Sequence, residues 1–239
     1  MLLHGAMGDS REWRLQLDGL ADEFTLVAWD APGCGGSFDP REDLGLDGYA
    51  DALAAFIDRL GLDTPHVMGL SFGSALSLEL FRRHPDCVRS LVLVSAYAGW
   101  AGSLGREEAE RRRRWGQTVA DRAPHQVAAD FATTLFTSDV PPEIVQAELE
   151  VMTDFRPAGV RAMANALADA DLREMLPSID IPTLLVHGDA DQRAPVRVAE
   201  ELHAGIPGSK LVVIPGSGHV VTLEAPELVN DAVRRFLRT

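Results

Sequence analysis

Long apolar runs, basic residues and cysteine are all scarce in this chain of 239 residues. No stretch approaches the roughly 18 consecutive apolar residues that a membrane-spanning helix needs. The first five residues, MLLHG, have neither the basic start nor the long apolar run of a secretory signal. These absences predict a soluble, cytoplasmic protein that does not bind a membrane.

The shortage of basic residues gives the chain a strong negative charge. Lysine and arginine together number 22 against 36 aspartates and glutamates, a formal net charge of −14. Such a charge repels phosphate backbones, so we expect no nucleic-acid partner. The two cysteines, Cys34 and Cys87, are too few for a disulfide framework or a metal-ligand cluster, so we expect no metal site. The expected partner is a small-molecule substrate.

Short apolar runs typical of buried strands alternate with amphipathic segments typical of helices. The expected strands, besides a short one at Leu2-Leu3, are Phe24–Trp29, His66–Gly69, Val88–Val94, Thr183–His187 and Lys210–Ile214. The expected helices are Ser10–Ala21, Asp47–Leu60, Phe72–His84, Pro195–Ala204 and Ala225–Leu237. This alternation predicts an α/β fold, with a mostly parallel sheet and helices on both faces. Ligands of such sheets bind beyond the carboxyl ends of the strands.

The strand pattern stops over residues 98–178. This region consists of helix-like segments divided by prolines, which predicts a helical insertion in a core formed by residues 1–97 and 179–239. Within the insertion, acidic residues lie about four positions ahead of Arg111–Arg114, which supports a solvated helix. The alternative is an arginine that faces an anionic substrate.

Large apolar side chains are spread over the insertion, which would cover a site at the edge of the sheet. Each of them either packs between helices or contacts the substrate. We select Trp100, Trp115 and Phe136 as substrate-binding candidates. Their character favours a small, mostly apolar substrate.

The segment Gly69-Leu70-Ser71-Phe72-Gly73 lies where a strand meets a helix. One interpretation is a tight turn, since glycine commonly marks such junctions. The other is a sharply bent backbone that presents the hydroxyl of Ser71 as a nucleophile, with glycines where no side chain fits. The second interpretation requires a base and an acid elsewhere in the chain.

A serine hydroxyl becomes reactive when a base removes its proton and a carboxylate orients that base. Among seven histidines, His219 stands out because it lies in a glycine-containing loop between the last strand and the last helix, with no evident structural task. For the acid, Asp189 and Asp191 both follow the strand at Thr183–His187. Either can instead be a turn residue that bonds the local backbone.

Acyl transfer also needs two backbone N–H groups aimed at the oxygen that becomes negative. Phe72 supplies one candidate, because its N–H follows Ser71 at the start of a helix, where amides are unpaired. Ala6 supplies the second, in a glycine-bearing turn that follows an apolar strand.

The chain resembles the α/β-hydrolase family over nearly its whole length. The blocks that carry the resemblance, in order, are Leu3-His4-Gly5-Ala6, the D-x-x-G-x-G-x-S loop at 30–37, the G-x-S-x-G at 69–73, Gly188–Asp191 and Gly218-His219. The family places its acid at the fourth position of G-x-x-D, which falls on Asp191 and leaves Asp189 to the turn. Its helical cap corresponds to the insertion.

Two features depart from the family pattern. Ser74 stands where the family often has a further glycine. The oxyanion turn arrives by residue 5, so the two edge strands that usually precede it are absent from this sequence.

The resemblance implies a serine hydrolase that cleaves a small carboxylic ester or lactone through an acyl-enzyme, with Ser71, Asp191 and His219 as its catalytic triad and with no cofactor or metal. Other chemistries of the family use the same residues. They are enol-lactone hydrolysis, carbon–carbon bond cleavage in diketones, and cofactor-free peroxidation. A small-molecule receptor that keeps the triad but barely turns over is a further alternative.

Overall fold

The computed structural model describes residues 1–41 and 43–238. Residues 42 and 239, which both fall in the predicted core, lie outside the described residues. All neighbouring strands of the sheet are parallel, in the order β2-β1-β3-β4-β5-β6. The strands are β1 (Leu2–Leu3), β2 (Ala28–Trp29), β3 (His66–Leu70), β4 (Ser90–Val94), β5 (Thr183–Gly188) and β6 (Lys210–Ile214). The predicted parallel sheet is confirmed.

Two strands are shorter than the sequence predicts. The edge strand β2 begins at Ala28 instead of Phe24, because its only neighbour, β1, offers two residues for pairing. Strand β4 begins at Ser90 instead of Val88, because a 3-10 turn at Pro85–Cys87 precedes it. The ends of the other predicted strands differ by at most one residue.

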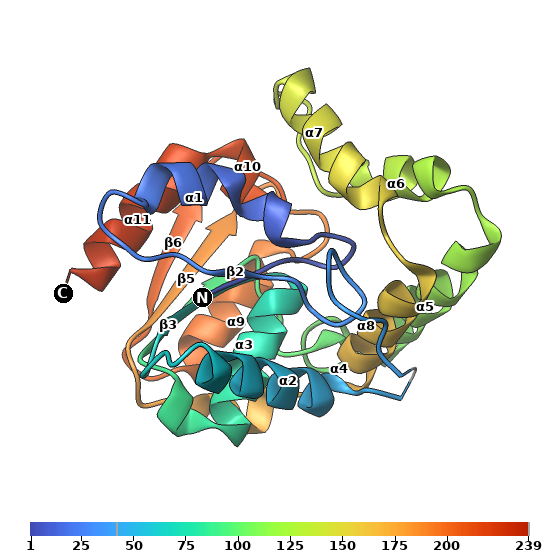
Figure 1. Ribbon diagram of the computed structural model, residues 1–239. Coiled ribbons are helices and arrows are strands. Elements are labelled where there is room, and N and C mark those ends of the chain that lie inside the picture. The colour runs from blue at the N-terminus through green and yellow to red at the C-terminus, as the bar shows by residue number, and fades with distance from the viewer. Residues whose placement is uncertain (42, 239) are drawn as a thin grey trace.

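Helices cover both faces of the sheet (Figure 1). On one face lie α1 (Arg14–Leu20), α10 (Val221–Glu224) and α11 (Pro226–Leu237), and on the other lie α2 (Leu46–Arg59), α3 (Phe72–Arg83) and α9 (Val196–Gly205). Successive residues of a strand point to opposite faces, so Met68 and Leu70 enter one apolar cluster and Val67 enters the other. Burial on both faces explains why the strand sequences are apolar throughout.

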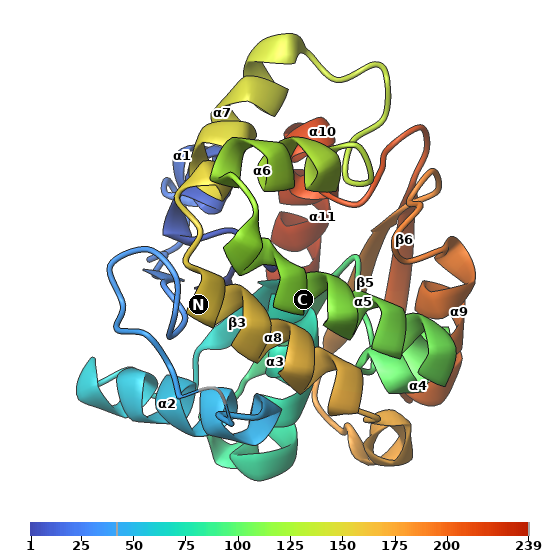
Figure 2. The ribbon, with the colours of Figure 1, turned by 90° about the vertical axis from the view of Figure 1, so that its right-hand side faces the viewer.

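Between β4 and β5 the chain forms only helices within the described residues (Figure 2). These are α4 (Trp100–Leu104), α5 (Arg106–Thr118), η3 (Val119–Asp121), α6 (Pro124–Ala132), α7 (Pro142–Thr153), α8 (Pro157–Asp169) and η4 (Arg173–Ser178). Prolines begin α6, α7 and α8, where their missing N–H costs nothing. Helices α5 and α8 lie side by side, and Gly116 allows the close approach because a Cβ there would meet Ala164. In the part of the chain that the structure describes, no helix combines the length and hydropathy needed to cross a bilayer.

Candidate active site

Ser71 lies on a strained turn between β3 and α3. Its φ of 52° and ψ of −105° are uncommon for a residue with a side chain. A Cβ on Gly69 would overlap the carbonyl oxygen of Gly73, and a Cβ on Gly73 would overlap that of Leu3. Both glycines are therefore required by the close approach of α3 to β1 and β3, and that approach holds the bend at Ser71.

The structure brings three of the predicted site residues into one hydrogen-bonded chain. His219 Nε2 lies 2.9 Å from Ser71 Oγ, and His219 Nδ1 lies 2.8 Å from Asp191 Oδ2. All three side chains are buried. Because the carboxylate can only accept, Nδ1 of His219 carries the proton, and Nε2 is free to accept from the hydroxyl of Ser71.

The pKa values of His219 and Asp191 favour a neutral imidazole beside a charged carboxylate. Burial lowers the pKa of His219 below its usual value, and this outweighs the opposite effect of Asp191. Burial works against a charged Asp191, but the neighbouring His219 together with the Ala194 N–H keeps the pKa of that carboxyl below its usual value. Oδ1 of Asp191 accepts the N–H groups of Arg193 (2.8 Å) and Ala194 (2.9 Å). At neutral pH the imidazole is therefore uncharged and able to take a proton.

Asp189, the other candidate acid, does not touch His219. Its carboxylate accepts the N–H of Gly216 at 2.7 Å and so closes the loop before His219. The structure thus places Asp191 beside the imidazole and Asp189 in a turn.

The backbone N–H groups of Ala6 and Phe72 have no acceptor among the described residues. Phe72 is the first residue of α3, so its N–H is one of those that a helix leaves unpaired. Ala6 follows the end of β1, which pairs directly with β3, the strand that leads to Ser71. Two free amides therefore lie on the two segments next to the hydroxyl.

Two side chains for which the sequence predicted no role hold the turn before Ala6. Glu12 Oε2 accepts the N–H of Gly5 at 2.7 Å. His4 Nδ1–H donates to the carbonyl of Gly5 at 2.8 Å, and His4 Nε2 accepts the N–H of Ala31 at 3.1 Å. The His-Gly pair itself was a signal for His4, whereas nothing in the sequence pattern distinguished Glu12 from a surface glutamate.

Glu12 is part of a buried pair of carboxyl groups between the core and the insertion. It is 4% exposed, and Glu148 on α7 is 3% exposed. Burial raises the pKa of Glu12 well above its usual value, and the charge of Glu148 adds to this. Burial, with the charge of Asp9 adding to it and that of Arg11 opposing, raises the pKa of Glu148 to about 7. The contact of α7 with the core is therefore sensitive to proton uptake.

Glu224 is a third side chain that sequence patterns missed. Its carboxylate accepts the N–H of Gly218 at 2.9 Å and both the N–H and the hydroxyl of Thr137, at 3.1 and 2.7 Å. It thus connects the loop of His219 to the insertion. By contrast, Asp30 of the D-x-x-G-x-G-x-S block accepts the N–H of Gly36 within its own loop and the N–H of Ser10 from the segment before α1.

A cavity of about 380 Å³ lies between the insertion and the core, and Ala6 forms part of its wall. Trp100 and Trp115, two of the predicted substrate contacts, line it together with Phe131. Phe136, the third, is not among the lining residues and packs against the apolar cluster on one face of the sheet. The full lining is Ala6, Met7, Trp100, Glu108, Arg111, Arg112, Trp115, Asp130, Phe131, Thr134, Val160, Ala164, Gln192 and Arg193.

Over residues 1–41 and 43–238, no group of three or more His, Cys, Asp or Glu side chains is arranged to hold a metal ion. Both cysteines are free thiols, with Cys34 buried and Cys87 half-buried.

Comparisons with known proteins show the family of this chain. A family model described as the alpha/beta hydrolase fold matches residues 1–226. The protein YisY of Bacillus subtilis, an AB hydrolase superfamily protein, is 32% identical over 99% of this chain and 90% of its own length. A pimeloyl-[acyl-carrier protein] methyl ester esterase of Neisseria meningitidis is 30% identical over 99% of this chain and 92% of its own length. The structure of a thermophilic esterase from Thermogutta terrifontis superposes with a TM-score of 0.92 at 30% identity, covering 99% of this chain and 88% of that one.

Proposed function

The chain belongs to the alpha/beta hydrolase fold family, and from this premise we propose that it is a serine hydrolase that cleaves a carboxylic ester or lactone through an acyl-enzyme. The observation that carries the proposal is the chain of contacts from Ser71 Oγ through His219 to Asp191. The likeness to two esterases at 30% identity supports an ester or lactone as the bond that is cleaved.

In the first half of the reaction, the hydroxyl of Ser71 gives its proton to His219 Nε2 while the oxygen attacks the substrate carbonyl. The negative oxygen that forms is held by the N–H groups of Ala6 and Phe72. Asp191 orients the imidazole and stabilises its protonated form. The imidazolium then donates the proton to the leaving alkoxide, and the carbonyl re-forms as an ester of Ser71.

In the second half, a water molecule takes the place of the leaving alcohol. His219 removes one proton from it as its oxygen attacks the acyl carbonyl. The same two amides hold the second oxyanion, and the proton passes to Ser71 Oγ as the acid product leaves. In a lactone the alcohol stays attached to the acyl chain, and the same steps open the ring.

Pocket residues support a mostly apolar chain next to the scissile bond. Trp100, Trp115, Phe131 and Val160 supply apolar wall area in the cavity that Ala6 borders. A cavity of about 380 Å³ is at the small end of the range for ligand pockets, which is about 300–1,000 Å³. We therefore propose a short or medium-length substrate.

The test is the hydrolysis of p-nitrophenyl butyrate by the purified protein. Ser71→Ala is expected to lower kcat by at least about 10⁴-fold, because it removes the nucleophile. Ser77→Ala is the matched control, since Ser77 is also buried on α3 but donates to the carbonyl of Gly73 and does not touch His219. Equal activity in wild type and Ser71→Ala would overturn the proposal. Saturable ligand binding without turnover in wild type would favour a receptor instead.

A further inference from the structure

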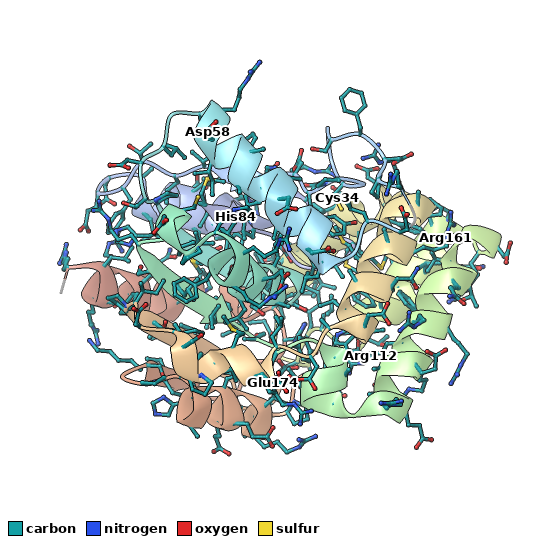
Figure 3. All side chains as sticks on the ribbon, turned by 90° about the horizontal axis from the view of Figure 1, so that it is seen from below. Cys34, Asp58, His84, Arg112, Arg161 and Glu174 are labelled. Atoms are coloured by element: carbon teal, nitrogen blue, oxygen red, sulfur yellow. The ribbon has the colours of Figure 1, made fainter. Side chains whose placement is uncertain are left out.

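Three arginines line the cavity beside Ala6, and they differ in how their donors are used. Arg111 is exposed and pairs with Glu108. Arg112, on α5 (labelled in Figure 3), donates to Glu108 at 2.7 Å, to the hydroxyl of Tyr97 at 3.1 Å and to the carbonyl of Arg193 at 2.9 Å. Each of its three guanidinium nitrogens thus has a partner. Arg112 therefore links the insertion to the core loop that carries Asp191 by hydrogen bonds.

Arg193 is held in place but lacks a counter-ion. Its guanidinium carbon lies 4.2 Å from the ring centre of Phe131, and its Nη1 donates to the hydroxyl of Thr134 at 2.9 Å. Among the described residues it forms no ion pair within 4.0 Å. The nearby carboxylate of Asp191 is already used by His219, Ala194 and the backbone N–H of Arg193 itself.

The free donors of Arg193 face a cavity in an otherwise negative protein. Burial lowers the pKa of Arg193 to about 10, which still leaves it charged at neutral pH. A charged group withdrawn from water is costly unless a partner of opposite charge is present. Trp100, which also lines the cavity, has a buried indole N–H without an acceptor in the part of the chain that the structure describes. Arg193 thus has donors at the cavity for which the protein supplies no acceptor.

We propose that Arg193 forms an anion subsite, and that the substrate is an ester or lactone whose acyl chain also carries a carboxylate. This inference rests on the proposed function. The planar fork of one guanidinium matches a carboxylate in a two-bond arrangement. The apolar wall formed by Trp115 and Val160 accommodates the chain between the two ends. We place the carboxylate on the acyl part because Ala6, whose amide would hold the acyl oxygen, borders the same cavity.

A pair of esters tests the specificity. One is the mono-p-nitrophenyl ester of adipic acid, which keeps a free carboxylate, and the other is its neutral amide counterpart, p-nitrophenyl adipamate. Wild type is expected to favour the carboxylate ester by at least tenfold in kcat/KM. Arg193→Gln is expected to remove that preference, and Arg193→Lys to restore part of it. The matched control is Arg114→Gln, because Arg114 is exposed, lies on α5 and does not line the cavity. It is expected to keep the wild-type ratio.

Binding without catalysis separates this inference from the proposed function. Monomethyl adipate, which keeps a free carboxylate, and its neutral amide counterpart, methyl adipamate, are titrated calorimetrically into the Ser71→Ala variant, with and without Arg193→Gln. Monomethyl adipate is expected to bind at least tenfold more tightly than methyl adipamate, and only when Arg193 is present. If the two compounds bind equally, or if Arg193→Gln leaves the binding of monomethyl adipate unchanged, the anion subsite is wrong. If monomethyl adipate binds as expected but wild type hydrolyses neither p-nitrophenyl ester, the subsite stands and the hydrolase proposal fails.

Discussion

The loops of the sheet and the helices of the insertion are held by different kinds of contact. Around Ser71 the backbone decides the geometry, because Gly69 and Gly73 let α3 lie against β1 and β3. In the insertion Gly116 lets α5 approach α8 in the same way, but exposed side-chain ion pairs such as Arg113–Asp169 and Arg122–Asp130 are added to that contact. Backbone contacts have few ways to change, whereas side-chain contacts can be exchanged at small cost. We therefore expect the chemistry to depend on the loops of the sheet, and the choice of substrate to depend on the insertion together with Arg193 of the loop after β5.

The two regions meet at groups that belong to both. Glu12 of the core holds the turn before Ala6 and is buried with Glu148 of the insertion. Glu224 connects the loop of His219 to Thr137. A change of pH or of sequence at these groups is therefore expected to affect the contact between the regions before it affects the sheet.

The largest expected effect within the loops comes from replacing, one at a time, the two aspartates after β5 with asparagine. Asp191→Asn is expected to lower kcat by about 10³ to 10⁴-fold, because an amide stabilises the wrong tautomer of His219 and cannot balance its charge. Asp189→Asn is the control, since Asp189 only accepts the N–H of Gly216. Steady-state kinetics on a neutral ester provides the measurement. A larger loss for Asp189→Asn would reverse the assignment of the acid.

A methyl group at Gly73 tests whether close backbone contacts determine the geometry around Ser71. Gly73→Ala is expected to lower activity by about 10² to 10³-fold and stability by about 3 kcal/mol, because α3 must move away from the carbonyl of Leu3. Gly36→Ala is the control, because a Cβ there meets only Asp30 Oδ2 at an ordinary 3.7 Å. Activity assays and urea unfolding measure both effects. Wild-type activity in Gly73→Ala would show that the close approach is not needed.

The pH profile tests the ionisation of His219. Burial lowers its pKa, so the neutral base persists to lower pH than for an exposed histidine. On a neutral ester, kcat/KM is expected to be flat at neutral pH and to fall tenfold per pH unit on the acid side, with a midpoint below 6.5. A midpoint at 7 or above would mean that the charge of Asp191 outweighs burial.

The smallest expected effect lies at the contact between the regions. The pKa of Glu148 is raised to about 7 in the folded protein, so the folded state binds more protons than the unfolded state between about pH 4.5 and 7. Glu148 therefore makes its full contribution to the free energy of unfolding below that window, and the contribution is lost as pH rises through it. Glu148→Gln is expected to be more stable than wild type by about 1–3 kcal/mol at pH 8 and equal to it at pH 4.

Urea unfolding at the two pH values measures this difference. Glu150→Gln, an exposed neighbour on α7, is the control and should follow the wild-type curve. A Glu148→Gln variant that gains nothing at pH 8 would place the pKa of Glu148 near its ordinary value.

Much of the fold could be predicted because each element carries its own pattern. The predicted helices at Phe72–His84 and Ala225–Leu237 are found within one residue at each end, since an amphipathic or buried run ends where its pattern ends. The length predicted for strand β2 was too great, because the length of this edge strand depends on the two residues that its neighbour β1 offers for pairing.

Only those residues of the candidate site that stand in glycine or loop patterns could be predicted. Ser71 and His219 stand in such patterns, and the structure brings them together, although their chemical roles stay predictions. The lining of the cavity depends on how helices of the insertion pack, so Phe136 could not be told from Phe131 in the sequence. Arg193 lies two residues after Asp191, but its lack of a counter-ion is visible only once Phe131 and Thr134 are placed around it.

The central claim is that His219, oriented by Asp191, makes the hydroxyl of Ser71 a nucleophile. The most direct test is to treat the folded protein with a fluorophosphonate and to map the adduct by peptide mass spectrometry. The account predicts one adduct, on Ser71, formed rapidly in wild type and not detected in His219→Ala over the same time. Adduct formation at another serine, or equal labelling of Ser71 without His219, would contradict it.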